Sequence, residues 1–435
     1  MCKEDRVRLS DAIVKGRQRW TVLLLTMGMF INALDRGSLA VAAPIIMKEF
    51  NLGAAVMGLA LSAFFWTYAL CNIPAGNAAD RFGSKAALGW AATLWSVASA
   101  ATGLVRSSLG LVLVRLGVGA GEAAAFPVSA KVVADTFPSK ERGTAIGWYL
   151  SGARLGLAAT PLIMGFLIVR SNWRIAFFAT GLFSLSWCLL WYWTFKDISR
   201  PTGAGSKAPK ITIPWKQLLA NRVALGLFVA KFLGDYVYHM FVTWLPGYLM
   251  IERGFSVMKV GIYASLPFFA GFIAQPVVGH VSDWLIRRGA SVTVARKFTL
   301  LGCQICAAAV IAVGFVHSPM VAVALLTLSV AAEAGIGGMM FTMGAEVSPL
   351  KMAGSFVGSM NTVGALAGIV APTLTGLIVK FTGSFRLALA VGGCAVLLAA
   401  LFIFLVVPEI KPIELKETMS HETTVPEERG NLHGS

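Results

Sequence analysis

Twelve long apolar runs are the feature that most constrains this chain. A helix needs about 20 apolar residues to cross a bilayer. Only 13% of the 435 residues are charged and 57% are hydrophobic, whereas a soluble domain carries about 25% charged residues. The sequence therefore excludes a soluble domain and predicts an all-α polytopic membrane protein with twelve transmembrane helices. The runs lie near 19–46, 54–75, 85–105, 108–132, 142–169, 174–195, 221–250, 257–281, 297–316, 319–345, 353–379 and 384–407.

The runs form two sets of six, separated by a polar segment rich in Pro, Gly, Ser and Lys, a composition typical of a linker. Two short motifs recur with one offset: FPSKERGTAIG at 137–147 matches SPLKMAGSFVG at 348–358, and PLIMG at 161–165 matches PTLTG at 372–376. Such repeats predict two pseudo-symmetric halves with a substrate site between them. We predict an N-terminal tail, a first half, a linker, a second half and a C-terminal tail at 1–18, 19–195, 196–217, 218–407 and 408–435.

The basic residues have an uneven distribution. Lys and Arg outnumber Asp and Glu by 37 to 21, giving a formal net charge of +16. Most of them fall on the predicted tails and on the connections of one side, which is the positive-inside pattern. We therefore expect both termini in the cytoplasm and the protein in the inner or plasma membrane, as a monomer in contact with lipid. The other interpretation, a basic patch for nucleic acid, does not account for this alternation.

Charged residues inside the apolar runs are the strongest functional signal, because each is costly unless it is paired or hydrated. Asp35 and Arg36 lie in the first run, and Arg115 and Glu122 lie in the fourth. Seven residues separate Arg115 from Glu122, so both lie on one helix face. A carboxylate in a cavity that opens alternately to each side can load and release a proton. We predict proton coupling by Asp35 and Glu122 with Arg115; the alternative is a static lattice of ion pairs.

Arginine is also the residue best suited to hold an organic anion, because its planar fork matches a carboxylate. Arg36 directly follows Asp35, so we expect the two to be paired at rest and Arg36 to be freed when Asp35 is protonated. Arg154 is a second candidate, although nothing in the sequence orients it. Lys231 is a third, but Asp235 follows it by four residues, and a structural ion pair on one helix is an equal alternative.

The connection after the second run carries a recognisable motif, GNAADRFGSK at 76–85. It resembles the loop signature of the major facilitator superfamily, and GHVSD at 279–283 resembles a degenerate second copy. The resemblance implies the fold of that superfamily, with two six-helix halves. It also implies that Gly76, Asp80 and Arg81 act in gating and do not touch substrate. The alternative is an ordinary basic turn.

Four further motifs lie within the apolar runs: Leu34-Asp35-Arg36, Ser62-Ala63-Phe64 with Tyr68, Gly121-Glu122-Ala123 with Phe126-Pro127, and Trp244-Leu245-Pro246 with Tyr248. These motifs resemble the anion:cation symporter family within that superfamily, which includes bacterial galactonate, glucarate and hexuronate transporters. The resemblance implies that Asp35 and Glu122 are the protonated carboxylates and that Arg115 pairs with them. It implies substrate contacts for Arg36, Tyr68 and Asn361.

The chain also departs from the galactonate-type pattern. Ala153, followed by Arg154, stands where those members carry Gln, and Phe341 stands where they carry Trp. His239 replaces an aromatic residue, and Glu333 adds an acid. We include Arg154, Lys231 and Phe341 among the substrate-binding candidates, and we conclude that the pocket is not a copy of the galactonate site.

The sequence thus predicts a secondary transporter that imports an organic anion with protons, by alternating access. In the run 221–250, Lys231-Phe232-Leu233-Gly234-Asp235 leading to Trp244-Leu245-Pro246 resembles the segment of hexuronate carriers, so we favour a hexuronate or an aldonate. Another carboxylate (an aromatic acid or a dicarboxylate) and a drug/H⁺ exporter of the same fold are the alternatives, and the sequence leaves Na⁺ coupling open. No catalytic or nucleotide-binding motif is present in the sequence. We therefore expect no enzyme activity, no metal and no cofactor, and we expect the H⁺ gradient to drive transport.

Overall fold

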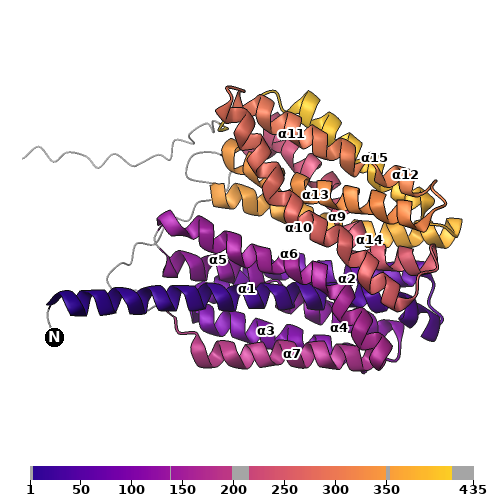
Figure 1. Cartoon of the computed structure of the whole chain (residues 1–435), viewed down its shortest axis with the longest axis horizontal. Coiled ribbons are helices and arrows are strands. Elements are labelled where there is room, and N and C mark those ends of the chain that lie inside the picture. Colours follow the sequence, from indigo (N-terminus) through magenta and orange to yellow (C-terminus); the bar gives the residue numbers. More distant parts are fainter. Residues whose placement is uncertain (1–2, 138, 198–214, 349–352, 414–435) are drawn as a thin grey trace, which may run out of the picture.

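The computed structural model describes residues 3–137, 139–197, 215–348 and 353–413. Every regular element within these ranges is a helix (Figure 1). The helices are α1 (Lys3–Glu49), α2 (Ala54–Phe82), α3 (Ser84–Thr102), α4 (Ser108–Glu122), α5 (Ala125–Thr136), α6 (Ser139–Arg170), α7 (Trp173–Thr194), α8 (Trp215–Ala220), α9 (Arg222–Ile251), α10 (Val257–Arg287), α11 (Val292–Ala307), α12 (Val310–Val313), α13 (Pro319–Val347), α14 (Ala353–Thr382) and α15 (Arg386–Val406).

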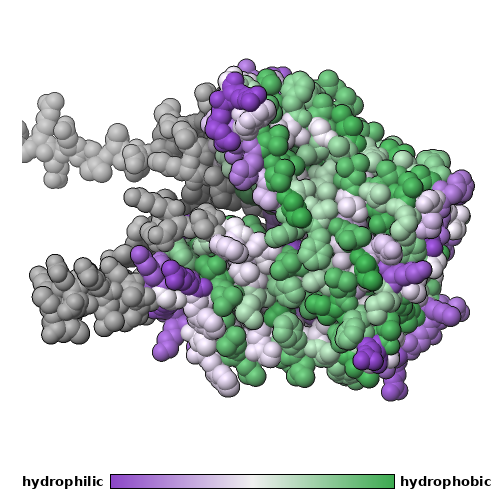
Figure 2. Space-filling view, viewed as in Figure 1, coloured by the Kyte–Doolittle hydropathy of each residue, from purple (hydrophilic) through white to green (hydrophobic). Residues whose placement is uncertain are grey.

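Eleven of the described helical segments are long and apolar enough to cross a membrane, with α4–α5 and α11–α12 each counted as one. The remaining apolar run is α3, in which Ser and Thr recur along the helix. This helix packs against α4 and α7 as part of the bundle. Apolar side chains cover the visible face of the molecule between two polar ends (Figure 2). The prediction of an all-α polytopic membrane protein is confirmed.

The helices form two groups that lie one above the other in Figure 1. In the first group, α1 packs on α6, α2 on α4, and α3 on α7. In the second group, α9 packs on α14 and α15, and α13 packs on α10 and α11. The groups meet where α2 contacts α14, α6 contacts α10, and α1 contacts α9.

The predicted segment boundaries fall partly outside the described residues. Positions 198–214 of the expected linker and 414–435 of the expected C-terminal tail lie there. The expected N-terminal tail is helical from Lys3, because α1 begins well before the apolar run.

Polar side chains cap the helices at the predicted connections. Asn172 accepts a hydrogen bond from the backbone N–H of Ile175 at the start of α7, and Asn221 does so at the start of α9. Such caps satisfy N–H groups that have no partner within the helix. Ser107, Ser256 and Ser291 cap α4, α10 and α11 in the same way.

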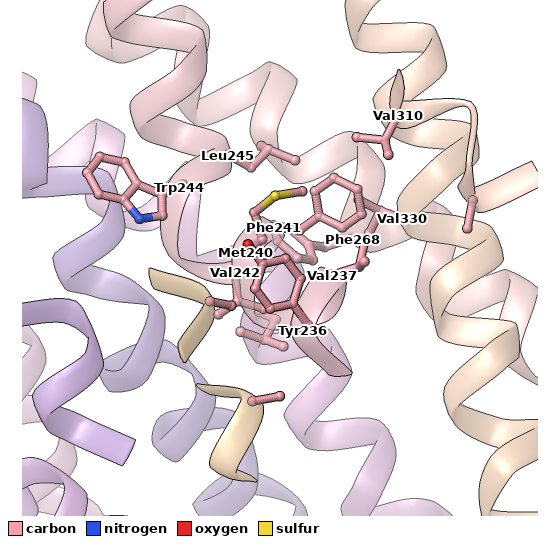
Figure 3. Packing of buried hydrophobic residues seen from close by; sticks show 14 of the residues in the cluster. Tyr236, Val237, Met240, Phe241, Val242, Trp244, Leu245, Phe268, Val310 and Val330 are labelled. Atoms are coloured by element: carbon pink, nitrogen blue, oxygen red, sulfur yellow. The ribbon is translucent and has the colours of Figure 1, made fainter. Parts of the chain in front are cut away.

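The core of the second group is built around α9. Figure 3 shows Tyr236, Met240 and Phe241 of this helix gathered among apolar side chains. Trp244, which is 2% exposed, donates from its Nε1 to the carbonyl oxygen of Pro372 at 3.0 Å. Tyr236 and Trp244 therefore pack in the core of this group.

Glycines mark where the two groups approach most closely. A Cβ placed at Gly165 of α6 would lie 3.1 Å from the Cα of Gly261 on α10, and one placed at Gly261 would lie 3.7 Å from the Cα of Gly165. Four further glycines lie at the other end of the bundle, away from the contact between Gly165 and Gly261. They belong to α6, α10, α2 and α14. Among the described residues, Gly147, Gly279 and Gly358 have no such neighbour within 4 Å, and Gly76 has only a side-chain atom of Pro127 in its own group. The groups are thus in contact at the Gly165 end and apart at the Gly147 end.

This asymmetry predicts a selective cross-link. In a variant without the six native cysteines, Gly165→Cys combined with Gly261→Cys should form a disulfide on mild oxidation, because a Cβ at either position lies within 4 Å of the other residue's Cα. Gel mobility after cleavage between the groups would report it. The matched pair Gly147→Cys with Gly279→Cys should not cross-link in the same state. Equal cross-linking of both pairs would contradict the arrangement.

Candidate functional site

A buried ion pair joins the first and fourth predicted spans. The Nε of Arg36 (α1) donates to Oε2 of Glu122 (α4) at 3.0 Å, and its Nη2 lies 2.9 Å from the same oxygen. The Arg36 side chain is 13% exposed, and that of Glu122 is fully buried. Arg36 also donates from Nη2 to Oδ1 of Asn32 at 3.2 Å. The second carboxylate oxygen, Oε1 of Glu122, has no hydrogen-bond partner among the described residues.

Two aromatic rings of α2 hold the Arg36 guanidinium in place. Its central carbon lies 5.0 Å from the Phe64 ring and 5.1 Å from the Tyr68 ring, and these rings stack on each other. Both distances are within the range of a cation–π interaction. A carboxylate brought to Arg36 would therefore meet a cation whose orientation is already set.

Arg115 also lies against the Phe64 ring. Its guanidinium carbon is 5.0 Å from that ring, and its Nη2 donates to the carbonyl oxygen of Arg36 at 3.5 Å. The ion pair to Glu122 comes from Arg36 and not from Arg115. Seven residues along a helix span about 10 Å, so the Arg115 guanidinium influences Glu122 electrostatically without bonding to it.

Asp35 does not pair with Arg36, contrary to the expectation from sequence. Consecutive residues on a helix do not share a face, and Asp35 points instead toward α3 and α7. Its Oδ1 accepts from the hydroxyl of Ser99 at 2.9 Å, and its Oδ2 accepts from the hydroxyl of Ser184 at 2.5 Å. All three side chains are buried. The two serines were missed at the sequence level, where each is an ordinary small residue within an apolar run.

The second group contributes an ion pair within α9. The Nζ of Lys231 lies 2.7 Å from both carboxylate oxygens of Asp235 and 4.7 Å from the centre of the Phe341 ring on α13. The side chains of Lys231 and Asp235 are 5% and 14% exposed. Asp235 fits against α14 at Gly364, where any Cβ would overlap its carboxylate.

Gly364→Ala should therefore destabilise the protein, because the added methyl group forces Asp235 away from Lys231. We expect a loss of about 1–3 kcal/mol, the range for overpacking a buried site, measured as a lower midpoint of thermal unfolding in detergent. Gly358→Ala is the matched control on the same helix, since its added methyl group meets no neighbour within 4 Å. Equal midpoints for the two variants would argue against the tight fit.

Arg154 and Glu333 face each other across the contact between the groups. Arg154 (α6) lies 5.7 Å from the ring of Tyr238 on α9. Glu333 (α13), which is 3% exposed, interacts electrostatically with Arg154.

His239 packs edge-on against Phe65 of the first group with ring centres 4.4 Å apart, and its Nδ1 has no hydrogen-bond partner among the described residues.

The remaining predicted residues lie in two places. Phe341 is 37% exposed beside Lys231, and Asn361 is half-buried on α14. Gly76, Asp80 and Arg81 lie at the end of α2, away from the Arg36–Glu122 pair. There Asp80 forms an ion pair with Lys131 of α5, with 2.9 Å between Oδ1 and Nζ, and Arg81 lies over the Phe82 ring. Within the described ranges, no cluster of three His, Cys, Asp or Glu side chains could hold a metal.

Comparison with known families identifies the family of this chain. The model of the Major Facilitator Superfamily matches residues 25–372. The chain belongs to the major facilitator superfamily. It is therefore a multi-pass membrane transporter, not an enzyme.

Curated relatives and solved structures agree with this assignment. The probable galactarate/D-glucarate transporter of Escherichia coli is 31% identical over 427 residues, covering 91% of this chain and 95% of the relative. The hexuronate transporter of Bacillus subtilis is 34% identical over 387 residues, covering 86% and 91%. The crystal structure of the D-xylose–proton symporter has a TM-score of 0.75 at 17% identity, covering 90% of this chain and 98% of that one. A bacterial homologue of the human lysosomal transporter Spinster, in an inward-facing and occupied conformation, also has a TM-score of 0.75, at 21% identity and with coverage of 89% and 96%. These two structures support the fold alone.

Proposed function

We propose that this transporter imports a sugar acid together with protons, by alternating access and without a cofactor. The observation that carries the proposal is the Arg36–Glu122 pair. Glu122 is fully buried and Arg36 is its ion-pair partner. A substrate carboxylate and Glu122 compete for one guanidinium, so protonating Glu122 favours anion binding. Proton binding and anion binding are then coupled although the proton and the anion do not contact each other.

Asp35 is the second proton carrier in this proposal. It is held by the hydroxyls of Ser99 and Ser184, and no ion pair to a cation within 4 Å is found for it among the described side chains. A buried carboxylate that lacks a cationic partner is costly in its charged form. Movement of the helices that changes its access to water would therefore change its proton occupancy.

The substrate class follows from the relatives and from the polar groups of the site. Relatives are named as transporters of galactarate and D-glucarate, of D-galactonate and of hexuronate. Tyr68 and Asn361 offer hydrogen bonds to hydroxyl groups, and the cations Arg36 and Arg154 favour anions. A drug/H⁺ exporter is disfavoured, because a cationic or hydrophobic compound would meet these arginines. We place both termini in the cytoplasm of the cell membrane on the basis of the Lys and Arg distribution, and we treat the protein as a monomer.

Uptake into proteoliposomes tests the proposal. Labelled sugar acids should accumulate above the external concentration under an inward proton gradient, and a protonophore should abolish the accumulation. An inward Na⁺ gradient at equal pH should not replace the proton gradient. Accumulation that follows Na⁺ and ignores the protonophore would contradict proton coupling, and selective transport of cationic dyes would favour the exporter.

A further inference from the structure

Arg154 is a cation of the site for which the described residues provide no bonded acidic partner. Its guanidinium carbon faces the Tyr238 ring at 5.7 Å, and its Nη2 lies 3.6 Å from the position that a Cβ at Gly337 would take. In the described part of the chain it has neither a hydrogen bond nor an ion pair within 4 Å, and it is only half-buried. Its planar fork of donors is therefore open to an incoming acid group.

The other cations of the site are engaged. Arg36 is bound to Glu122, and Lys231 is bound to both oxygens of Asp235. Arg115 donates to a backbone carbonyl and lies against Phe64. Arg154 differs from these three because its contact is an aromatic face, which orients a guanidinium without occupying its N–H groups.

The neighbours of Arg154 include a glycine and an acid. Gly337 has no side chain, and Oε1 of Glu333 lies 4.0 Å from the same Cβ position that Nη2 of Arg154 approaches. Glu333 is thus near Arg154 without bonding to it. A carboxylate inserted between them would gain a bidentate contact with Arg154, whereas Glu333 would lose only a longer-range attraction.

Arg36 and Arg154 lie against one continuous set of aromatic contacts between the two groups of helices. Arg36 lies over Phe64, which contacts Phe65. Phe65 contacts His239 of the other group, and the neighbouring Tyr238 ring faces Arg154. A monoacid needs one of these two cations. A molecule with a carboxylate at each end can meet both.

We propose that Arg154 forms a second carboxylate subsite and that the substrate is a sugar diacid that extends from Arg36 to Arg154. This inference rests on the proposed function and narrows its substrate class. It replaces the preference for a hexuronate or an aldonate. That preference rests on the resemblance of the run 221–250 to hexuronate carriers, and the sequence does not orient Arg154.

The balance of charge in the site is consistent with a dianion. The described cluster contains four acids and four cations: Asp35, Glu122, Asp235 and Glu333, and Arg36, Arg115, Arg154 and Lys231. Protonating the two acids of the first group leaves two positive charges in excess. A diacid balances both, so the loaded site carries no net charge.

Three compounds with one stereochemistry test the proposal. Galactarate has a carboxylate at both C1 and C6. Galactonate has one at C1 only, and galacturonate has one at C6 only. In proteoliposomes, galactarate should inhibit uptake of labelled galactarate at a concentration about tenfold lower than either monoacid, which corresponds to one additional charge-assisted contact. In Arg154→Gln the galactarate value should rise about tenfold while the monoacid values change less than about twofold. Arg170→Gln, an exposed site at the end of α6, should leave all three unchanged.

Two further measurements separate a binding function from a structural one. Ligand-induced thermal stabilisation of purified Arg154→Lys and Arg154→Gln reports binding independently of transport. Glu333→Gln should bind galactarate at least as well as the parent protein, because the competing acid is removed. An equal loss for all three sugar acids in Arg154→Gln, or a loss in Glu333→Gln as large as in Arg154→Gln, would overturn the subsite.

The outcomes distinguish the inference from the function on which it rests. If galactonate or galacturonate is accumulated with protons and competes as well as galactarate, the diacid subsite is refuted and the sugar-acid symporter stands. If none of the three compounds is accumulated under a proton gradient, the proposed function fails, and the subsite fails with it.

Discussion

Glu122→Gln should lose all accumulation of substrate against its gradient, with net uptake falling to that of empty liposomes. Gln keeps the size of Glu and an oxygen that can accept from Arg36, but it cannot exchange a proton. Arg36 then lacks its internal competitor, whose carboxylate lies 2.9 Å away, so substrate should still bind. The step that fails is the return of the empty carrier, because no negative charge then balances Arg36 in the empty site.

Exchange assays separate this effect from misfolding. Glu122→Gln should still exchange internal unlabelled substrate for external labelled substrate, since that reaction never requires the empty carrier to return. Glu409→Gln, whose side chain is 61% exposed in a surface ion pair, is the matched control and should behave as the parent protein. Full gradient-driven accumulation by Glu122→Gln would remove Glu122 from the coupling mechanism.

The fold could be predicted from sequence because each span carries its own signal. A run of about 20 apolar residues can satisfy its backbone in a bilayer only as a helix, so the spans follow from composition alone. The position of α3 shows the limit of this argument. Its serines and threonines lower its hydropathy, and Ser99 among them is used to bind Asp35.

The membership of the site was also predictable in part, because a charge within an apolar run requires a reason. The pairings were not. Asp35 and Arg36 are adjacent in sequence yet point to different helices, and Arg115 does not contact Glu122 although both lie on one face. Which cation meets which acid depends on how α1, α3, α4 and α7 are rotated against one another, and sequence periodicity carries no information about a neighbouring helix.

Arg154 illustrates the same limit with a larger consequence. On sequence alone it is one arginine within the apolar run 142–169, and nothing orients it. Its interest arises from Tyr238 of α9 and Gly337 of α13, which come from the other group of helices. A contact between the two groups cannot be inferred from either group alone.

Arg36→Lys should weaken substrate binding about 10- to 100-fold while the protein still folds. Lysine keeps the positive charge, so attraction to an anion persists, but it is a point charge without a planar fork. Arg36 contacts Glu122 through Nε and Nη2, donates from Nη2 to Asn32, and lies against Phe64 and Tyr68. A lysine ammonium cannot reproduce these contacts together, and the bidentate contact with a substrate carboxylate is lost as well.

Binding of galactarate to the purified protein measures this effect directly, by competition in exchange and by ligand-induced thermal stabilisation. Arg106→Lys, an exposed position between α3 and α4, is the matched control. The ratio between substrates is informative. If Arg36 binds the carboxylate that every sugar acid carries, Arg36→Lys should weaken galactarate, galactonate and galacturonate by similar factors, whereas Arg154→Gln should weaken galactarate alone. Unchanged affinity in Arg36→Lys would mean that substrate binds elsewhere, and Glu122 would then hold Arg36 only as a structural ion pair.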